Sequence, residues 1–365
     1  MAKDMFPEDR AAARAGASVG AIPSPEETAR RARLRHVGDE DPGLARRRRG
    51  RGFSYHDPDG ARVAEAETLA RIRALAIPPA WTEVWICPDP DGHIQATGRD
   101  ARGRKQYRYH PRWTDARALA KFDALPAFAE ALPAMRARIE ADMRRRALGR
   151  EKVLASVCWL LDHALVRIGN PDYARENASF GLTTLRARHL RLDGDELRLR
   201  FMGKSGREWD LRLTDRRVQR VARACHELPG QRLFRWVEEG GTHPVGSQDV
   251  NDYLREISGR DITSRHFRTW AATVQAAAAL AQTPPPGSKA EMQRRVNAAI
   301  DQVAKRLGNT RAVCRSGYVH PLVPERYAEG VLAQELSRGG PRREGLDQAE
   351  ARTLAWLNRE ARARR

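Results

Sequence analysis

Residues 197–213 read LRLRFMGKSGREWDLRL. Apolar side chains alternate with charged ones on both sides of a central turn, first from Leu197 to Phe201 and then from Trp209 to Leu213. A period of two is typical of a half-buried β-strand. The turn at 203–206, GKSG, supplies glycines for a tight connection. The stretch therefore predicts a β-hairpin.

Helical periodicity surrounds this hairpin. A stripe of valine and leucine between Val153 and Leu165 predicts the helix before it, and Gly169 stands at the expected stop. The helices expected in this part of the chain are 118–147 (two broken segments), 152–168, 216–228, 247–256, 264–281, 290–307, 310–318 and 345–365. Gly308 is expected to cap the helix 290–307, and Thr310 to begin the next one.

The N-terminal part has a different pattern. Between residues 53 and 113, short apolar runs alternate with turn residues, which predicts strands at 81–86 and 93–97 and one helix at 63–75. Residues 1–45 have little hydrophobic periodicity and are expected to form a mobile basic arm. The run RRRRGRG at 46–52 is expected to be a solvated, mobile segment that could also grip phosphates.

These patterns predict an α+β protein with three parts. We expect a flexible basic arm at 1–45, a small β-rich domain at 46–115 and a larger, mainly helical domain with a β-hairpin at 116–365. The chain has 365 residues, which is long enough for two domains with their own cores.

Charge and composition indicate the kind of binding partner and the cellular compartment. The net charge of +19 favours nucleic acid, although an arginine-rich organism could also place arginine on every solvated surface. The four cysteines lie far apart, so neither a disulfide framework nor a zinc cluster is expected. No run of about 18 apolar residues occurs and the first ten residues lack an apolar stretch, so we expect no membrane span, no signal peptide and a cytoplasmic protein.

Four polar or charged residues stand where local structure breaks. Arg167 lies at the end of the predicted helix 152–168, and Lys204 is at the hairpin tip. Arg268 is in the first turns of the helix 264–281, and Tyr318 ends the helix 310–318.

In this order, the four segments resemble the poxvirus-like bacterial type IB DNA topoisomerases of the tyrosine recombinase and topoisomerase IB superfamily. The sequence at 166–190, VRIGNPDYARENASFGLTTLRARHL, is especially close to the pattern around the family's first catalytic arginine. The resemblance runs from about residue 46 to about residue 325. It does not cover the N-terminal arm or the last helix.

The resemblance implies a role for each of these residues. Tyr318 matches the nucleophile, Arg167 and Arg268 match the two catalytic arginines, and Lys204 matches the catalytic lysine, which is the expected general acid. Asn309 stands nine positions before the tyrosine, where the family usually has histidine.

Another position beside the second arginine differs from the family pattern. The family often has lysine three residues before that arginine, and Arg265 stands there as an expected supporting residue.

The resemblance also implies a DNA-binding strand. Gln106, Tyr107, Arg108 and Tyr109 match a Gln-Tyr-x-Tyr element that lies in the DNA major groove, and Tyr173 matches a further DNA contact. On a strand, Gln106 and Arg108 share one face and the two tyrosines the other. A half-buried strand with two core tyrosines is the alternative.

The implied activity is an isomerase that relaxes supercoiled DNA. One strand of double-stranded DNA is cut through a 3′-phosphotyrosyl bond and then resealed, with no ATP, metal or other cofactor. The implied architecture is a clamp around the duplex, formed by a monomer in the bacterial nucleoid.

Two other classes of protein stay open at this point. A tyrosine recombinase shares the chemistry, but it usually has His-x-x-Arg around the second arginine, where this chain has Arg265 in the first place. It also usually has a helical N-terminal binding domain. A non-catalytic basic protein that coats DNA would explain the charge, but not the ordered set of residues.

Overall fold

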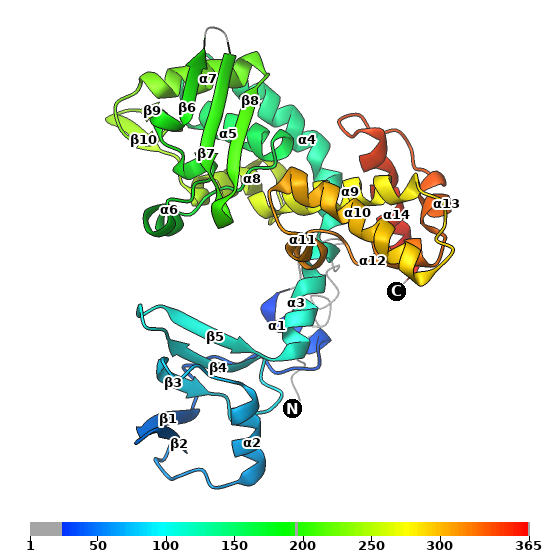
Figure 1. The fold of residues 1–365 in the computed structure, drawn as a ribbon. Helices are drawn as coiled ribbons and strands as arrows, with labels where there is room; N and C mark the ends of the chain where they lie inside the picture. The colour runs from blue at the N-terminus through cyan, green and yellow to red at the C-terminus, as the bar shows by residue number, and fades with distance from the viewer. Residues whose placement is uncertain (1–23, 194–195, 364–365) are drawn as a thin grey trace, which may run out of the picture. The chain divides into compact units, whose positions relative to one another are not determined.

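The computed structural model describes residues 24–193 and 196–363 (Figure 1). The described chain forms two compact units, one within residues 22–123 and one within 124–365. An antiparallel sheet dominates the first unit and helices dominate the second, so the predicted α+β fold class is confirmed.

The first unit is a five-stranded sheet with three helices. Its elements are α1 (Pro25–Arg31), β1 (Leu44–Arg49), β2 (Gly52–His56), α2 (Ala66–Ala74), β3 (Thr82–Ile86), β4 (Ile94–Arg99), β5 (Lys105–Tyr109) and α3 (Pro111–Asp123). The strand order is β2-β1-β3-β4-β5, and every pair is antiparallel. Ile72 of α2 packs with Val84, Ile86 and Ala96 of the sheet, so α2 covers one face and the core lies beneath it.

The arginine run forms a strand, so the prediction of a mobile segment at 46–52 was wrong. Residues 46–49 lie in β1 and pair with β2. The guanidinium of Arg46 lies 4.1 Å from the ring centroid of Phe53 and donates to the backbone carbonyls of Ile77, Pro78 and Trp81. Because these contacts satisfy the one inward-facing arginine, the strand can pair while Arg47 and its neighbours stay in solvent.

Part of the expected basic arm is ordered. Ser24 accepts a hydrogen bond from the amide of Glu27 and begins α1, and Ala29, Leu34 and Trp113 form a small core between α1 and α3. Residues 1–23 lie outside the described chain. The domain boundaries expected at 45/46 and 115/116 stay a prediction, whereas the compact unit of the structure ends at residue 123.

The second unit contains eleven of the described helices and two of the described sheets. Its helices are α4 (Leu125–Met143), α5 (Arg150–His163), α6 (Pro171–Asn177), α7 (Arg216–Glu227), α8 (Ser247–Ser258), α9 (Ser264–Ala281), α10 (Lys289–Leu307), α11 (Arg311–Gly317), α12 (Leu322–Ala328), α13 (Leu332–Ser337) and α14 (Gln348–Ala363). Its strands and short 3₁₀ turns are β6 (Leu190–Asp193), β7 (Glu196–Met202), β8 (Glu208–Leu213), β9 (Arg235–Glu238), β10 (Gly241–Pro244), η2 (Leu182–Thr184), η3 (Ala187–His189) and η4 (Lys204–Gly206).

The predicted hairpin is confirmed as β7 and β8, with Leu199 opposite Leu211. Leu197 and Leu199 are buried, while Arg198 forms an ion pair with Asp210 across the exposed face. The β6 strand adds to the other edge of β7. The alternation seen in the sequence therefore reflects one covered and one solvated face.

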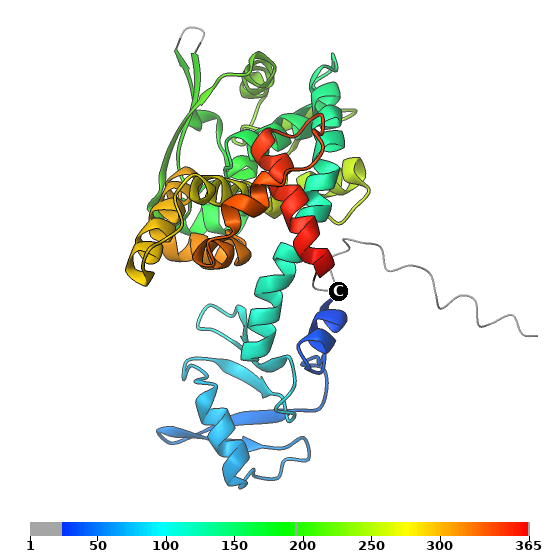
Figure 2. The same cartoon turned by 90° about the vertical axis from the view of Figure 1, so that its right-hand side faces the viewer.

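The α9 helix lies among the other helices of the second unit. It packs against α4, α5, α10 and α14, and α14 also contacts α4 (Figure 2). No described helix is long and apolar enough to cross a membrane. All four cysteines are buried and free.

Helix boundaries differ most from the prediction after α5. The predicted helix 152–168 ends at His163, because Leu165 has a φ of +55° and Gly169 a φ of +101°. Both values are in the left-handed region, which a helix cannot continue through. The segment that carries Arg167 is therefore an irregular loop rather than the last turn of a helix.

Candidate active site

The connection between α10 and α11 fixes Asn309. Gly308 has a φ of +61°, and the amide of Asn309 donates to the carbonyl of Ala304 at 3.0 Å. This is the glycine-capped helix end predicted from the sequence. A side chain at Gly308 would come within 2.9 Å of the Trp209 ring, so the backbone turn and the close packing both require glycine.

The α11 helix carries Tyr318 from this turn to the surface of α9. The Thr310 hydroxyl accepts from the amide of Val313, as predicted, and Tyr318 follows the last residue of the helix. Thr273 of α9 then fixes the tyrosine backbone. Its hydroxyl donates to the carbonyl of Tyr318 at 3.2 Å and accepts from the amide of His320 at 3.2 Å.

Arg268 is buried beneath the ring of Tyr318. Its side chain is on α9, five residues before Thr273, and the residue is 3% exposed. The guanidinium donates to the carbonyls of Leu165 and Leu307, the latter at 2.8 Å, and its carbon lies 5.1 Å from the centre of the Tyr318 ring. Its Nε makes no hydrogen bond within the described residues. Two backbone carbonyls thus fix this charge next to the tyrosine.

Arg167 approaches the same ring from the loop after α5. Its guanidinium carbon lies 5.9 Å from the Tyr318 ring centre, and its Nη2 donates to Oδ1 of Asn309 at 2.7 Å. Arginine has only donors, so the oxygen of the amide must face it. The Nδ2 of Asn309 is buried and meets no oxygen acceptor among the described residues, and the thiol of Cys314 is its polar neighbour.

These two charges act on the hydroxyl of Tyr318. Burial raises the pKa of Tyr318, but the charges of Arg268 and then of Arg167 outweigh burial. The net effect holds its pKa below the ordinary value. Burial also lowers the pKa of Arg268, although a guanidinium still carries its charge at neutral pH.

Lys204 is not gathered with these four residues. It lies at the hairpin tip in η4, and its ammonium is 4.9 Å from the ring centre of Tyr173 on α6. Arg207 joins this tip to the end of α10 by donating to the carbonyl of Lys305 at 3.2 Å. The tip is therefore tied to the segment that ends in Asn309, and Lys204 itself is exposed.

Two side chains beside Arg268 behave differently from it. Arg265 is exposed, and its side chain makes no hydrogen bond or ion pair among the described residues. His266 stacks on Phe128, and burial lowers its pKa. Its ring therefore packs on α4, and its Nδ1 accepts from the amide of Thr263 at 3.0 Å.

The β5 strand has the two faces that its alternation predicts. Tyr107 and Tyr109 are 40% and 44% exposed, and their rings stack with centroids 5.6 Å apart. These values contradict the alternative of two core tyrosines. On the other face, Gln106 donates to Asp100 at 2.9 Å and Arg108 donates to the carbonyl of Ala76 at 2.9 Å.

Two features of the site could not be found from the sequence. Thr273 is an ordinary threonine inside an apolar helix, and the carbonyl of Leu165 is a backbone group. Thr273 holds Tyr318 and the carbonyl of Leu165 holds Arg268, and both contacts become visible only when α9 is packed against the two distant segments. Among the described residues, no group of three side chains could hold a metal ion.

Similarity to known proteins agrees with this geometry. Residues 110–334 match the family described as eukaryotic DNA topoisomerase I, catalytic core, and residues 52–100 match the bacterial DNA topoisomerase IB, N-terminal domain. DNA topoisomerase 1B of Acanthamoeba polyphaga mimivirus is 29% identical over 293 residues, which cover 78% of this chain and 87% of that protein. DNA topoisomerase 1 of Mycosarcoma maydis is 25% identical over 152 residues, which cover 36% of this chain and 15% of that protein. Because the first match spans more than half of the sequence, the chain belongs to the type IB DNA topoisomerase family, whose members are isomerases that act on DNA.

Proposed function

We propose that the chain relaxes supercoiled duplex DNA by cutting one strand through a covalent bond between Tyr318 and a 3′-phosphate, and then reseals it without ATP or metal. The observation that carries this proposal is the position of Tyr318 between two guanidiniums, 5.1 Å from that of Arg268 and 5.9 Å from that of Arg167. A lowered pKa makes its hydroxyl a better nucleophile near neutral pH.

The reaction is a transesterification. The Tyr318 oxygen gives up its proton to water and bonds to phosphorus, while the bond from phosphorus to the 5′-oxygen of the next nucleotide breaks and that oxygen takes up a proton. The phosphotyrosyl bond keeps the energy of the broken link, so the 5′-hydroxyl can reverse the step without ATP.

The two arginines are assigned different parts of the charge stabilisation. Arg167 has five N–H donors, and Asn309 takes one of them, so the others can reach the non-bridging oxygens of the phosphate. Each Nη of Arg268 donates one of its two hydrogens to a carbonyl, so Arg268 keeps further N–H donors, its Nε among them, beside its charge. By analogy with oxyanion-hole donors, each is worth roughly 2.7–4 kcal/mol of transition-state stabilisation.

Asn309 is proposed to donate from Nδ2 to the same oxygens. Its Oδ1 is occupied by Arg167, which leaves only the amide hydrogens for the phosphate. An amide is uncharged, so it should stabilise the transition state less than a protonated histidine would.

Lys204 is proposed as the general acid that protonates the leaving 5′-oxygen. Proton transfer of this kind contributes about 10²- to 10⁴-fold to the rate. Its contact with Tyr173 supports a role at the DNA surface, because both side chains are exposed at the hairpin side of the site. A duplex phosphate that binds here would compete with the Tyr173 ring for the ammonium.

DNA binding is proposed to involve both units. The stacked, exposed pair of Tyr107 and Tyr109 is a surface for base or phosphate contacts, and Tyr173 is a third. Gln106 and Arg108 would have to leave their present intramolecular partners to read base edges. We infer that the units close around the duplex so that the cut strand can swivel. One chain supplies every proposed site residue, so a monomer is sufficient.

The test is relaxation of negatively supercoiled plasmid in EDTA without ATP, with the wild type compared with Tyr318→Phe. The wild type should relax the plasmid, and Tyr318→Phe should bind it without changing its linking number. If both proteins bind and neither relaxes the plasmid, or if the wild type needs ATP or a metal, the proposal is wrong.

A further inference from the structure

We infer that a charge cluster of Arg136, Asp162 and Glu350, in which the two carboxylates are largely buried and the guanidinium is partly exposed, positions the two arginines around Tyr318, which makes the C-terminal helix α14 part of the catalytic apparatus. This inference rests on the proposed roles of Arg167, Arg268 and Tyr318. It adds positioning residues to them, and one of these comes from a part of the chain that the family match does not cover.

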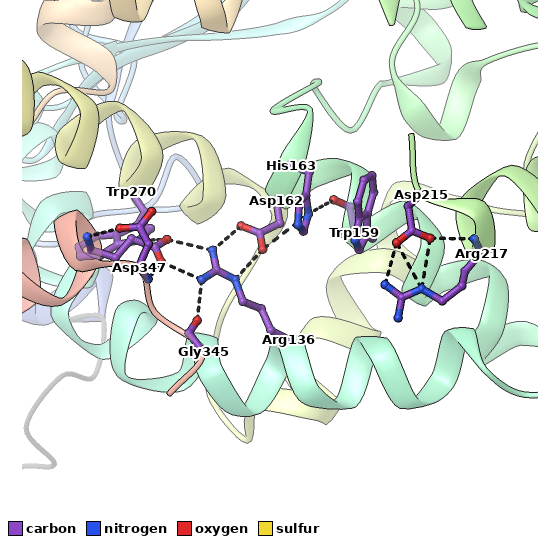
Figure 3. Close-up of polar contacts among 10 residues, drawn as sticks. Arg136, Trp159, Asp162, His163, Asp215, Arg217, Trp270, Gly345 and Asp347 are labelled. Carbon is purple, nitrogen blue, oxygen red and sulfur yellow. Dashed lines mark hydrogen bonds and ion pairs between the residues drawn. The ribbon is translucent and has the colours of Figure 1, made fainter. Parts of the chain in front are cut away.

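Arg136 of α4 holds two carboxylates at once. Its Nε and Nη2 donate to Asp162 at 2.7 and 3.1 Å, and its Nη1 and Nη2 donate to Glu350 at 2.8 and 2.9 Å. Nη1 also donates to the carbonyl of Gly345 at 2.7 Å (Figure 3). Both carboxylate side chains are only 10% exposed. Such forked contacts fix direction as well as distance.

The cluster reaches α9 through Trp270. The indole N–H of Trp270 donates to Oε1 of Glu350 at 3.2 Å, and the residue is 2% exposed. Trp270 lies two residues after Arg268 on the same helix. A bond between its indole and a carboxylate held by Arg136 therefore fixes the rotation and height of the turn that carries Arg268.

The cluster also reaches the loop that carries Arg167. Asp162 lies in the last turn of α5, three residues before Leu165, and the carbonyl of Leu165 accepts from Arg268. Arg167 follows two residues later. The same guanidinium of Arg136 thus holds the end of α5 and, through Glu350, the turn of α9, and these two segments meet at the Leu165–Arg268 contact.

Glu350 is itself held in place by the start of α14. Its amide donates to Asp347 at 2.8 Å, and the amide of Asp347 donates back to Oε2 of Glu350 at 3.0 Å. Removing one charged partner would leave the charges of the other two uncompensated. The cluster therefore holds α4, the end of α5 and the start of α14 together. The family match ends at residue 334, before α14 begins, so Glu350 lies outside the matched catalytic core.

The test compares Glu350→Gln with Glu335→Gln in the full-length protein. Glu335 is a matched control, because it also accepts an indole N–H, that of Trp356 at 2.9 Å, and lies near Arg326 at 3.9 Å, but Trp356 is on α14 rather than on α9. The measurements are the single-turnover rate constant of covalent DNA cleavage, the DNA Kd, and the pH profile of the cleavage rate.

Glu350→Gln should cleave about tenfold to a hundredfold more slowly, because a misplacement of about 1 Å can cost on the order of 10²-fold. Its DNA Kd should stay close to that of the wild type, and its pH profile should move to higher pH as Arg268 shifts away from Tyr318. Glu335→Gln should match the wild type in rate and profile. If the wild type forms its adduct but the two variants have equal cleavage rates and equal pH profiles, the inference is wrong.

A second variant decides the matter if Glu350→Gln does not fold. Arg136→Lys keeps the positive charge between the carboxylates but loses the fork. It should also slow cleavage and raise the pH midpoint, and a wild-type rate would overturn the inference. If the wild type forms no adduct at Tyr318, the proposed function fails instead, which is a distinguishable result.

Discussion

Arg167 donates from Nη2 to Oδ1 of Asn309 at 2.7 Å, across 142 residues of sequence. This bond joins the loop after α5 to the turn between α10 and α11, and the guanidinium of Arg167 also lies 5.9 Å from the centre of the Tyr318 ring. It also fixes which side of the asparagine amide faces the arginine. The bond therefore decides which side of the Asn309 amide is free to donate, and it uses one of the N–H groups of Arg167.

Replacing Asn309 tests this pair. Asn309→Ala removes the acceptor for Arg167 and the proposed donor to the phosphate, so single-turnover cleavage should slow by about 10- to 100-fold, in line with the loss of one hydrogen bond to a charged group. Asn309→His should keep or raise the rate, because imidazole can donate and can carry charge. An alanine variant as fast as the wild type would remove Asn309 from the site.

The pH dependence of cleavage tests the lowered pKa of Tyr318. The phenolate is the reactive form, so the rate should rise with pH and level off below the ordinary tyrosine value of about 10. Arg167→Gln removes one of the charges that lower this pKa, so its profile should move to higher pH. Arg255→Gln, which removes a surface arginine paired with Asp252 and Asp261, is the control and should leave the midpoint unchanged. An unshifted midpoint in Arg167→Gln would rule out electrostatic activation by this arginine.

Thr273 and Thr269 form a matched pair on α9. Thr273→Val leaves the carbonyl of Tyr318 and the amide of His320 without the hydroxyl, so it should lower the free energy of unfolding by about 1–3 kcal/mol and slow cleavage. Within residues 24–193 and 196–363, the Thr269 hydroxyl bonds only the carbonyl of Arg265 in its own helix. Thr269→Val should therefore have little effect in urea unfolding and in cleavage assays. Equal effects of the two substitutions would show that the hydrogen bonds of Thr273 to Tyr318 and His320 do not position the tyrosine.

The arginines of β1 divide into a structural residue and solvent-facing ones. Arg46→Ala should lower stability, because Arg46 stacks on Phe53 and binds three carbonyls. Arg47 is exposed, and its side chain makes no hydrogen bond among the described residues, so Arg47→Ala should keep stability and weaken DNA binding. If it neutralises one phosphate, the slope of log Kd against log salt should fall by about 0.9. An unchanged slope would place Arg47 outside the DNA surface.

The sequence predicted elements where one local signal dominates. Alternation predicted β7 and β8, and Gly308 and Thr310 predicted the end of α10 and the start of α11. The prediction was wrong for residues 46–49, which form part of a strand, and for the end of α5. In the first case the charge of Arg46 is satisfied by distant carbonyls, and in the second the left-handed φ of Leu165 interrupts an apolar stripe. The first cause is a set of tertiary contacts and the second is a backbone conformation, and neither is contained in a local sequence pattern.

For the candidate site, too, some features could be predicted from the sequence and others could not. The resemblance named Arg167, Arg268, Asn309 and Tyr318, and the structure brings these four together, but it pairs Lys204 with Tyr173 instead. The carbonyls that hold Arg268 have no signature in the sequence. Of the alternatives weighed from the sequence, the recombinase and the non-catalytic coat protein are both disfavoured by the match of residues 110–334 to a topoisomerase catalytic core.

The most direct test of the central claim is to identify the protein–DNA bond itself. The wild type would be trapped in SDS on a nicked duplex that cannot be resealed, then digested with protease and nuclease and analysed by mass spectrometry. We expect a peptide with Tyr318 bound to a 3′-phosphate and a free 5′-hydroxyl on the released strand. An adduct at another residue, or a bond to a 5′-phosphate, would contradict it.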